Sequence, residues 1–74
     1  MNRVQIILQN KYGRFYGQKH LLTDDQLESI KEASKLFYRS GFELTREDGS
    51  FVVFPPKLVS KSILYIESEK INDV

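Results

Sequence analysis

One segment of this sequence carries both the start signal and the stop signal of an α-helix. Thr23 stands where an N-cap residue is favoured, and Gln26 follows at the spacing of a capping box. Acidic residues come directly after the cap, where the positive end of the helix dipole favours them. Gly41 can take the positive φ that ends a helix. The sequence therefore predicts one helix over residues 24–39.

Apolar residues mark the face of this helix that we expect to pack inward. They recur at the helical spacing that places side chains on one side. After the glycine, an aromatic residue is placed to pack back on the last turn. The inward positions are Leu27, Ile30, Ala33 or Ser34, Phe37 and Phe42.

β-prone runs lie on both sides of the helix. The first alternates apolar and polar residues, with Ile7 as the exception, and a turn over residues 10–13 leads to a returning strand. After the helix, Asp48-Gly49 lies between two short β-prone runs, which is a strong hairpin signal. Pro55-Pro56 then ends a strand, because neither residue can donate a backbone hydrogen bond. The predicted strands are residues 3–9, 14–19, 42–45, 51–54 and a last one centred on 63–66.

The hairpin around Asp48-Gly49 leaves two registers open. Its loop is either two residues long or a three-residue turn with a glycine bulge. A shift of one residue exchanges the two faces of a strand. The loop therefore decides which side of the second strand joins the apolar residues of the first. The alternatives are Phe51 with Val53, or Val52 with Phe54, on the side of Phe42 and Leu44.

These elements predict one small α+β domain that spans residues 1–74. We expect an antiparallel-rich sheet of four or five strands, with the single helix packed on one of its faces. The element order is ββαβββ, or βαβββ if residues 14–19 form only a loop. The run FVVF, residues 51–54, is apolar on both faces, which favours a central strand. Residues 70–74 are predicted to be a frayed tail.

Length and composition limit what stabilises such a domain. The chain has 74 residues and no cysteine, so it has neither a disulfide nor a thiolate metal site. A core of this size gives no more than about 3–5 kcal/mol of net stability, and a homodimer would reinforce it. No apolar run approaches the length that spans a bilayer, and no segment resembles a signal peptide. The composition is typical of AT-rich bacterial or phage genomes. We therefore expect a cytoplasmic protein without a membrane partner, in a bacterial cell or in the host cell of a phage.

Charge is divided unevenly along the chain, although the net charge is only +1. The first 23 residues contain no Asp or Glu, and all ten acidic residues lie between Asp24 and Asp73. Such a division indicates an end of the molecule that faces anions. The cations and the histidine of the first part are Arg3, Lys11, Arg14, Lys19 and His20.

The segment KYGRFYGQKH, residues 11–20, combines cations with aromatic residues and has two interpretations. If it is extended, alternate side chains form one polar and aromatic face. Such a face suits single-stranded nucleic acid, because tyrosines stack on bases and cations contact phosphates. In the second interpretation, which we favour, the glycines mark a turn and a β-bulge, and the tyrosines only cover a small core. The face consists of Tyr12, Arg14, Tyr16, Gln18 and His20, with Phe15, Lys19 and Leu21 on the opposite side.

Catalytic and metal-binding patterns are missing from this sequence. His20 is the only histidine, and a metal site or an acid–base pair needs further ligands or an orienting partner. The glycines show no phosphate-binding motif. Asp24 and Asp25 are adjacent, so a helix splays them by about 100°. So short a chain also has little room for a pocket of roughly 300–1,000 Å³. We therefore expect no enzyme, no cofactor, no metal and no small-molecule substrate.

The function that remains is contact with another macromolecule. We expect a non-enzymatic accessory or regulatory module that binds protein, either by docking to a larger host protein, which it could inhibit, or by self-association. Exposed sheet edges are common sites for such contacts. The alternative is a single-stranded nucleic-acid-binding protein that uses the face from Tyr12 to His20. The candidate contact residues are Arg3, Lys11, Tyr12, Arg14, Tyr16, Lys19, His20, Tyr38 and Arg39.

Overall fold

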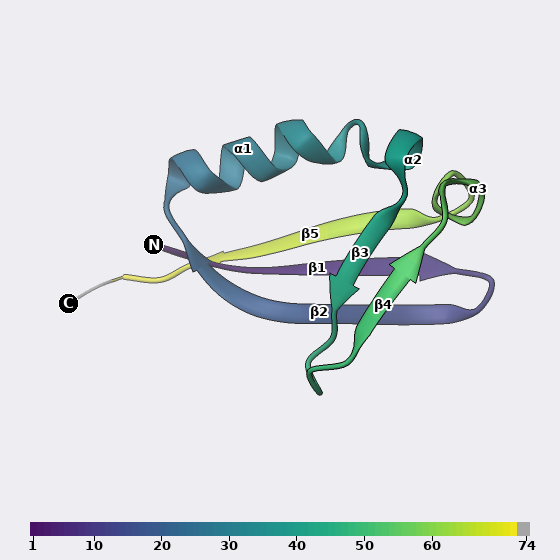
Figure 1. Cartoon of the computed structure of the whole chain (residues 1–74). Coiled ribbons are helices and arrows are strands. Elements are labelled where there is room, and N and C mark those ends of the chain that lie inside the picture. Colours follow the sequence, from purple (N-terminus) through teal and green to yellow (C-terminus); the bar gives the residue numbers. More distant parts are fainter. Residues whose placement is uncertain (73–74) are drawn as a thin grey trace.

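Five strands and three helices form the part of the chain that the structure, a computed structural model, describes (Figure 1). This part is residues 1–72, without the side chain of Tyr38. In chain order the elements are β1 (Asn2–Asn10), β2 (Gly13–Leu22), α1 (Asp24–Ser34), α2 (Phe37–Ser40), β3 (Phe42–Thr45), β4 (Phe51–Phe54), α3 (Pro56–Val59) and β5 (Ile63–Lys70). The main helix lies between the second and third strands, and all strand pairs are antiparallel. The predicted α+β class is therefore confirmed.

The strands form two sheets rather than the predicted single sheet of four or five strands. β1 lies in the centre of a three-stranded sheet and pairs with β2 on one side and β5 on the other. β3 and β4 form a separate two-stranded hairpin. The prediction that FVVF is a central strand is wrong, because this strand, β4, pairs only with β3 among the described strands. Its second apolar face points outward instead of into another layer.

A three-residue turn connects β3 and β4 and decides the register that the sequence left open. The Arg46 N–H donates to the Ser50 carbonyl at 2.8 Å, and the Gly49 N–H donates to the Arg46 carbonyl at 2.9 Å. Gly49 has a φ of 89°, which favours glycine at the bulge position. The register places four apolar side chains together on the inward face, which are Phe42, Leu44, Val52 and Phe54.

The predicted helix is confirmed at its start and is wrong at its end. The Thr23 hydroxyl accepts from the Gln26 N–H at 3.2 Å, and the Gln26 side chain accepts from the Thr23 N–H at 2.9 Å, which completes the capping box. α1 stops at Ser34, whose hydroxyl donates to the Lys31 carbonyl at 2.7 Å. Such a local bond competes with the helical hydrogen bonds. At Leu36 the backbone leaves the helical region, with φ −107° and ψ 3°, and α2 follows as a separate turn.

Gly41 ends α2 in a conformation that glycine adopts far more readily than other residues. Its φ is 79° with ψ −178°, so φ is positive as predicted, although ψ lies outside the left-handed helical region. Phe42 then packs edge-on against Phe37 with ring centroids 5.9 Å apart, which confirms the predicted contact. A Cβ at Gly41 would lie 2.8 Å from the Phe54 carbonyl oxygen. The chain therefore needs glycine here both for its backbone and for space.

α3 and the end of β5 differ from the prediction. α3 begins at Pro56, which fits the first turn of a helix because its missing N–H has no helical partner there. β5 continues to Lys70, and the Ile71 N–H donates to the Met1 carbonyl at 3.0 Å. The frayed tail predicted from residue 70 onward is therefore wrong for its first two residues. Its last two residues lie outside the described part.

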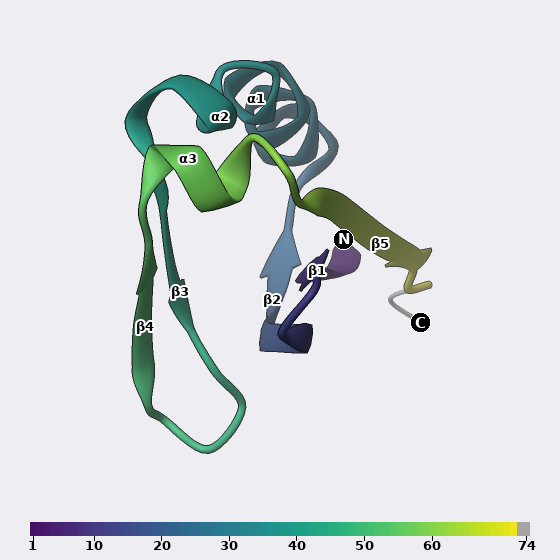
Figure 2. The same cartoon turned by 90° about the vertical axis from the view of Figure 1, so that its right-hand side faces the viewer.

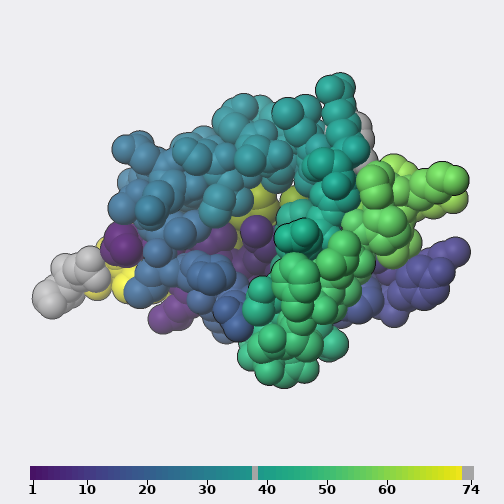
Figure 3. Space-filling view, in the orientation of Figure 1, coloured from purple at the N-terminus to yellow at the C-terminus, as the bar shows by residue number. Residues whose placement is uncertain are grey.

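One face of the three-stranded sheet carries the other elements. Seen along the strands in Figure 2, the helices and the hairpin lie on the same side of β1, β2 and β5. The hairpin crosses the sheet at an angle, and it covers much of the sheet together with α1 (Figures 1 and 3). The core between these layers consists of Leu8, Leu44, Phe54 and Val59, with Phe15 and Leu64 among the residues packed against it. The opposite face of the sheet has no helix or strand over it within residues 1–72 (Figure 2).

A hydrogen bond between Asn2 and Asp24 joins the start of β1 to the start of α1. The Asn2 amide donates to the Asp24 carboxylate at 2.7 Å, and the Lys70 ammonium lies 3.7 Å from that carboxylate. Both lower the pKa of Asp24, the hydrogen bond more than the lysine. The folded pKa therefore lies below the unfolded pKa. The resulting contribution to stability is present above the unfolded pKa and is lost as the pH falls through the folded pKa.

Asn2→Ala is expected to raise the pKa of Asp24 toward its ordinary value of 3.8. The variant removes the amide donor that stabilises the carboxylate. Titration of the Asp24 carboxyl carbon by NMR measures the change. Asn10→Ala, at the other end of β1, should leave this pKa unchanged. Equal Asp24 pKa values in the wild type and in Asn2→Ala would contradict the role of this hydrogen bond.

Candidate interaction surfaces

A β-bulge in β2 decides which way its cations and aromatic residues face. Between the pairs Gln5–Lys19 and Ile7–Tyr16, one residue of β1 lies opposite two residues of β2. Gly17 occupies this bulge, as the structural interpretation of the glycine predicted. The extra residue exchanges the faces of the side chains that follow it.

The face predicted from strict alternation is therefore wrong beyond the bulge. Arg14 and Tyr16 lie on the same side of the sheet as Lys19 rather than on the side of His20. His20 lies on the covered side, where it is exposed and lines a hollow with Ile30 of α1 and residues of β3. The predicted group from Tyr12 to His20 thus does not form one surface.

The uncovered side of the sheet carries one arginine and two tyrosines at the end near the β1–β2 turn. The Arg14 guanidinium lies 5.7 Å from the ring centre of Tyr16 and 5.1 Å from that of Tyr65. Ile7 lies between the two tyrosines in the register and is 1% exposed. The rings therefore cover an apolar residue and also hold the guanidinium by cation–π contacts. We call Arg14, Tyr16 and Tyr65 the arginine–tyrosine cluster.

The other end of the same side has mixed charge. The Arg3 guanidinium lies 3.4 Å from the Glu69 carboxylate, and both side chains are exposed. A hollow of about 260 Å³ there is lined by Lys19 but also by Glu67 and Glu69. The carboxylates offset the cations. Arg3 and Lys19 therefore do not extend the arginine–tyrosine cluster into one basic patch.

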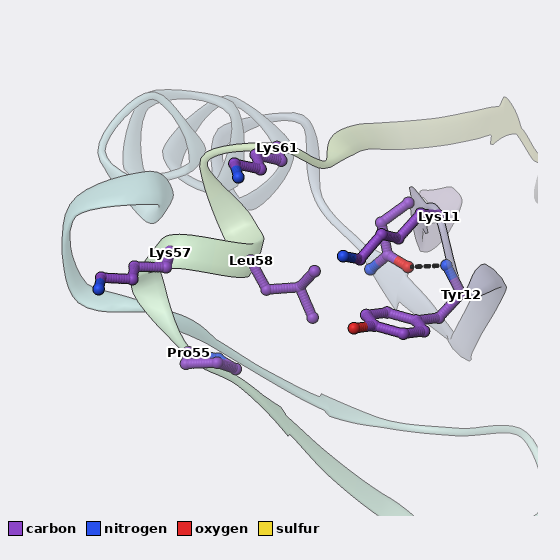
Figure 4. A pocket seen from close by; sticks show the side chains of 7 residues that line it. Lys11, Tyr12, Pro55, Lys57, Leu58 and Lys61 are labelled. Atoms are coloured by element: carbon purple, nitrogen blue, oxygen red, sulfur yellow. Dashed lines mark hydrogen bonds between the residues drawn. The ribbon is translucent and has the colours of Figure 1, made fainter.

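A groove with a volume of about 500 Å³ lies between the β1–β2 turn and α3 (Figure 4). The expectation that so short a chain has little room for a pocket of this size is therefore wrong. The Lys11 ammonium lies 5.2 Å from the ring centre of Tyr12 on one wall. Leu58 extends from α3 toward Tyr12 (Figure 4). We call this surface the basic groove, and its lining residues are Asn10, Lys11, Tyr12, Pro55, Lys57, Leu58 and Lys61.

Asn10 links the two walls of the basic groove. Its side-chain oxygen accepts from the Tyr12 N–H at 2.8 Å and holds the turn. Its amide nitrogen donates to the Ser62 hydroxyl at 3.4 Å, and that hydroxyl donates to the Leu58 carbonyl at 2.7 Å. Gly13 closes the turn with a φ of 126°. Hydrogen bonds therefore fix the backbone of Tyr12 relative to that of Leu58.

The fold brings together two parts of the chain that lack acidic residues. Residues 1–23 and residues 49–66 contain no Asp or Glu. The β1–β2 turn of the first part and α3 of the second lie at the same end of the molecule (Figure 1). The lysines of the groove, Lys11, Lys57 and Lys61, take part in none of the ion pairs within residues 1–72. The uneven charge of the sequence thus becomes a basic end of the folded chain.

The outward side of the hairpin exposes two apolar residues. Phe51 and Val53 are each 61% exposed and lie on the same side of β4. Their partners on β3 are Thr45 and Glu43. The other edge of β4 has no partner among the described strands. We call Phe51, Val53 and this edge the hairpin outer face.

Other predicted contact residues lie apart from these surfaces or outside the description. Arg39 is exposed on α2, whereas the side chain of Tyr38 lies outside the described part. Within the described residues, no group of three or more His, Cys, Asp or Glu side chains could hold a metal ion. The helices of residues 1–72 are all too short or too polar to cross a membrane.

Lys57, Lys61 and Tyr65 belong to these surfaces but were not predicted from the sequence. A signal existed for the lysines, because Pro56 favours the start of a helix, and residues four apart lie on one side of a helix. Tyr65 joins its neighbours through the pairing of β5 with β1, which no local pattern reveals. Models of protein families, curated proteins and solved structures contain no match to this chain.

Proposed function

We propose that this chain is a non-enzymatic protein-binding module that docks to its partner through the hairpin outer face. The supporting observation is the exposure of Phe51 and Val53 beside a strand edge that has no partner among the described strands. Burial of the two side chains removes apolar surface from water, which drives association. The open edge can add backbone hydrogen bonds to a strand of the partner. An accessory or regulatory role in the cytoplasm, with a bacterial or phage source, is part of this proposal.

The sequence of β4 also favours a contact. Natural edge strands are commonly protected from pairing by a charged residue or a proline. β4 has neither, since it reads FVVF and its prolines follow Phe54. Exposed apolar groups of this kind are typical of interaction sites. The partner is a larger protein or a second copy of the chain.

Phe51→Thr/Val53→Thr tests the proposal, because threonine keeps a high β-propensity while it removes apolar contact area. The wild-type chain is expected to recover one protein in stoichiometric amount from a lysate of its source cell. Alternatively, light scattering should give twice its monomer mass of 8.7 kDa. The double variant should lose that partner or that dimer. Circular dichroism checks that both chains are folded.

Lys31→Thr/Lys35→Thr is the matched control, since both lysines are exposed residues of the α1 region rather than of the hairpin. This variant should keep the partner or the dimer. A monomeric wild type that recovers no stoichiometric protein would refute the proposal. So would a control variant that loses the partner as fully as the hairpin variant does.

Single-stranded nucleic acid is the second candidate partner, favoured by the arginine–tyrosine cluster. Tyr16 and Tyr65 offer rings for stacking, which contributes about 1–3 kcal/mol per base, and Arg14 offers a charge for phosphate. The net charge of +1 and the mixed charge at the other end of the sheet weigh against it. The two candidates differ in salt dependence, because affinity for nucleic acid falls steeply as salt rises.

A further inference from the structure

We infer that the basic groove is a binding site for a nucleotide, that is, for a phosphate group carried on a sugar and a flat base. This inference goes beyond the proposed function, because the groove and the hairpin outer face share no residue. The nucleotide is either free in solution or one unit of a single strand. Both sources present the same chemistry, and the experiment below separates them.

The charge of the groove suits a phosphate. Three lysines line it, whereas no Asp or Glu does. Lys11 comes from the β1–β2 turn, while Lys57 and Lys61 come from α3 and the residues after it, so the cations belong to two walls. A phosphate monoester carries about −1.5 to −2 charges at neutral pH. Lysine has a flexible stem, so more than one ammonium group can reach the same phosphate.

The apolar part of the groove suits a base. Tyr12 is 67% exposed, and Leu58 approaches it from the opposite wall (Figure 4). Pro55 adds another apolar group to the lining. Aromatic rings stack on bases, and a volume of about 500 Å³ lies in the range of small-ligand sites. A base held between Tyr12 and Leu58 has its phosphate near Lys11, whose ammonium lies over the Tyr12 ring. Lys57 and Lys61 extend away from Tyr12 in Figure 4, so their flexible side chains have to rotate to contact the phosphate.

The walls of the groove are set before a ligand arrives. The hydrogen bonds of Asn10 hold the turn and join it to Ser62, so binding does not have to order the backbone. Lys11 already lies over the ring of Tyr12. The main loss of freedom on binding is that of the other lysine side chains. A preformed site keeps more of its gross interaction energy as affinity.

Titration of the isotope-labelled chain with adenosine monophosphate, followed by NMR, tests the site. We expect saturable shifts of the backbone amide signals of Lys11, Tyr12, Leu58 and Lys61. Inorganic phosphate and adenosine are the two component ligands, and each should bind more weakly than the nucleotide because each meets only part of the groove. Lys57→Glu/Lys61→Glu should weaken nucleotide binding about tenfold or more, since it reverses two of the three charges.

Three further variants separate the groove from general electrostatics and from the hairpin. Lys31→Glu/Lys35→Glu makes the same change of net charge near α1 and should leave the affinity within about twofold of the wild type. Tyr12→Ala should lower the affinity for the nucleotide toward that for phosphate and leave phosphate binding unchanged, because it removes only the stacking ring. Phe51→Thr/Val53→Thr should bind the nucleotide like the wild type. Nucleotide binding at the groove is therefore tested independently of docking through the hairpin outer face.

A short oligothymidylate, with and without a terminal phosphate, distinguishes the two sources of the nucleotide. Oligonucleotide binding that shifts the groove signals and weakens with salt assigns a single strand. Binding of the mononucleotide alone assigns a free nucleotide, and either outcome supports the site. The inference is overturned if no ligand gives saturable shifts at the groove, or if the shifts map only to the arginine–tyrosine cluster. It is also overturned if the Lys31→Glu/Lys35→Glu control weakens binding as much as the groove variant.

Discussion

Phe54→Ala is expected to lower the free energy of unfolding by about 3–5 kcal/mol, the range for truncation of a buried phenylalanine. Phe54 is 3% exposed, and its ring packs edge-on against Phe15 with centroids 5.1 Å apart. It belongs to the core with Leu44 and Val59, where hairpin, sheet and α3 meet. A core of this size rarely supplies more than about 3–5 kcal/mol of net stability. The variant should therefore be largely unfolded in water.

Circular dichroism in water shows whether Phe54→Ala is unfolded, urea titration measures the free energies of unfolding of the folded chains, and Phe51→Ala is the matched control. Both residues are phenylalanines of β4, but Phe51 faces outward and is exposed. Its replacement should change the free energy of unfolding by less than about 1 kcal/mol. Equal losses in the two variants would contradict the hairpin register, which places Phe54 inward and Phe51 outward.

Gly41→Ala is expected to lower the free energy of unfolding by about 2–4 kcal/mol, because two unfavourable effects add. The backbone has a φ of 79° with a ψ of −178°, a region that residues with a Cβ rarely adopt. The new Cβ would also lie 2.8 Å from the Phe54 carbonyl oxygen and 3.3 Å from the Pro56 ring. Rotation of a side chain cannot relieve a contact with a backbone oxygen, so β4 or α2 has to move.

Gly49→Ala separates the two effects. Gly49 also has a positive φ, of 89°, but a Cβ there would meet no atom within 4 Å. The replacement of Gly49 should lower the free energy of unfolding only by the cost of the positive φ, about 1–2 kcal/mol. Chemical unfolding of both variants beside the wild type gives the difference. If Gly49→Ala is as destabilising as Gly41→Ala, the close approach of Phe54 is not what makes glycine necessary at residue 41.

Local signals in the sequence predicted most of the elements. The capping box at Thr23 and the turn at Asp48-Gly49 act through near neighbours, and both form where they were predicted. Pro55-Pro56 ends β4 as expected, and Pro56 also favours the start of a helix, which is α3. The break at Leu36 was harder to predict, because the apolar spacing of the segment continues through it. The competing serine hydroxyl offers no strong signal beforehand.

Contacts between distant segments could not be predicted in the same way. FVVF is apolar on both faces. A strand covered on both faces and a strand that exposes one face can share this pattern, so the pattern does not distinguish a central strand from an edge strand. The glycine predicts a bulge at Gly17, but which side of the sheet His20 then faces follows only from the register with β1. The basic groove joins Lys11 to Lys57 and Lys61, which only the tertiary structure brings together. The sequence therefore predicted Lys11 and Tyr12 of the basic groove as contact residues but not Lys57 and Lys61.

The two neighbours of β1 in the sheet lie at very different distances along the chain, because β2 follows after a short turn and β5 follows only after the helices and the hairpin. Pairing of β1 with β2 closes a short loop, whereas pairing of β1 with β5 closes the long loop between Gln9 and Ile63, which costs more conformational entropy. Until β5 pairs, this edge of β1 is open to pairing with other chains, which favours aggregation during folding.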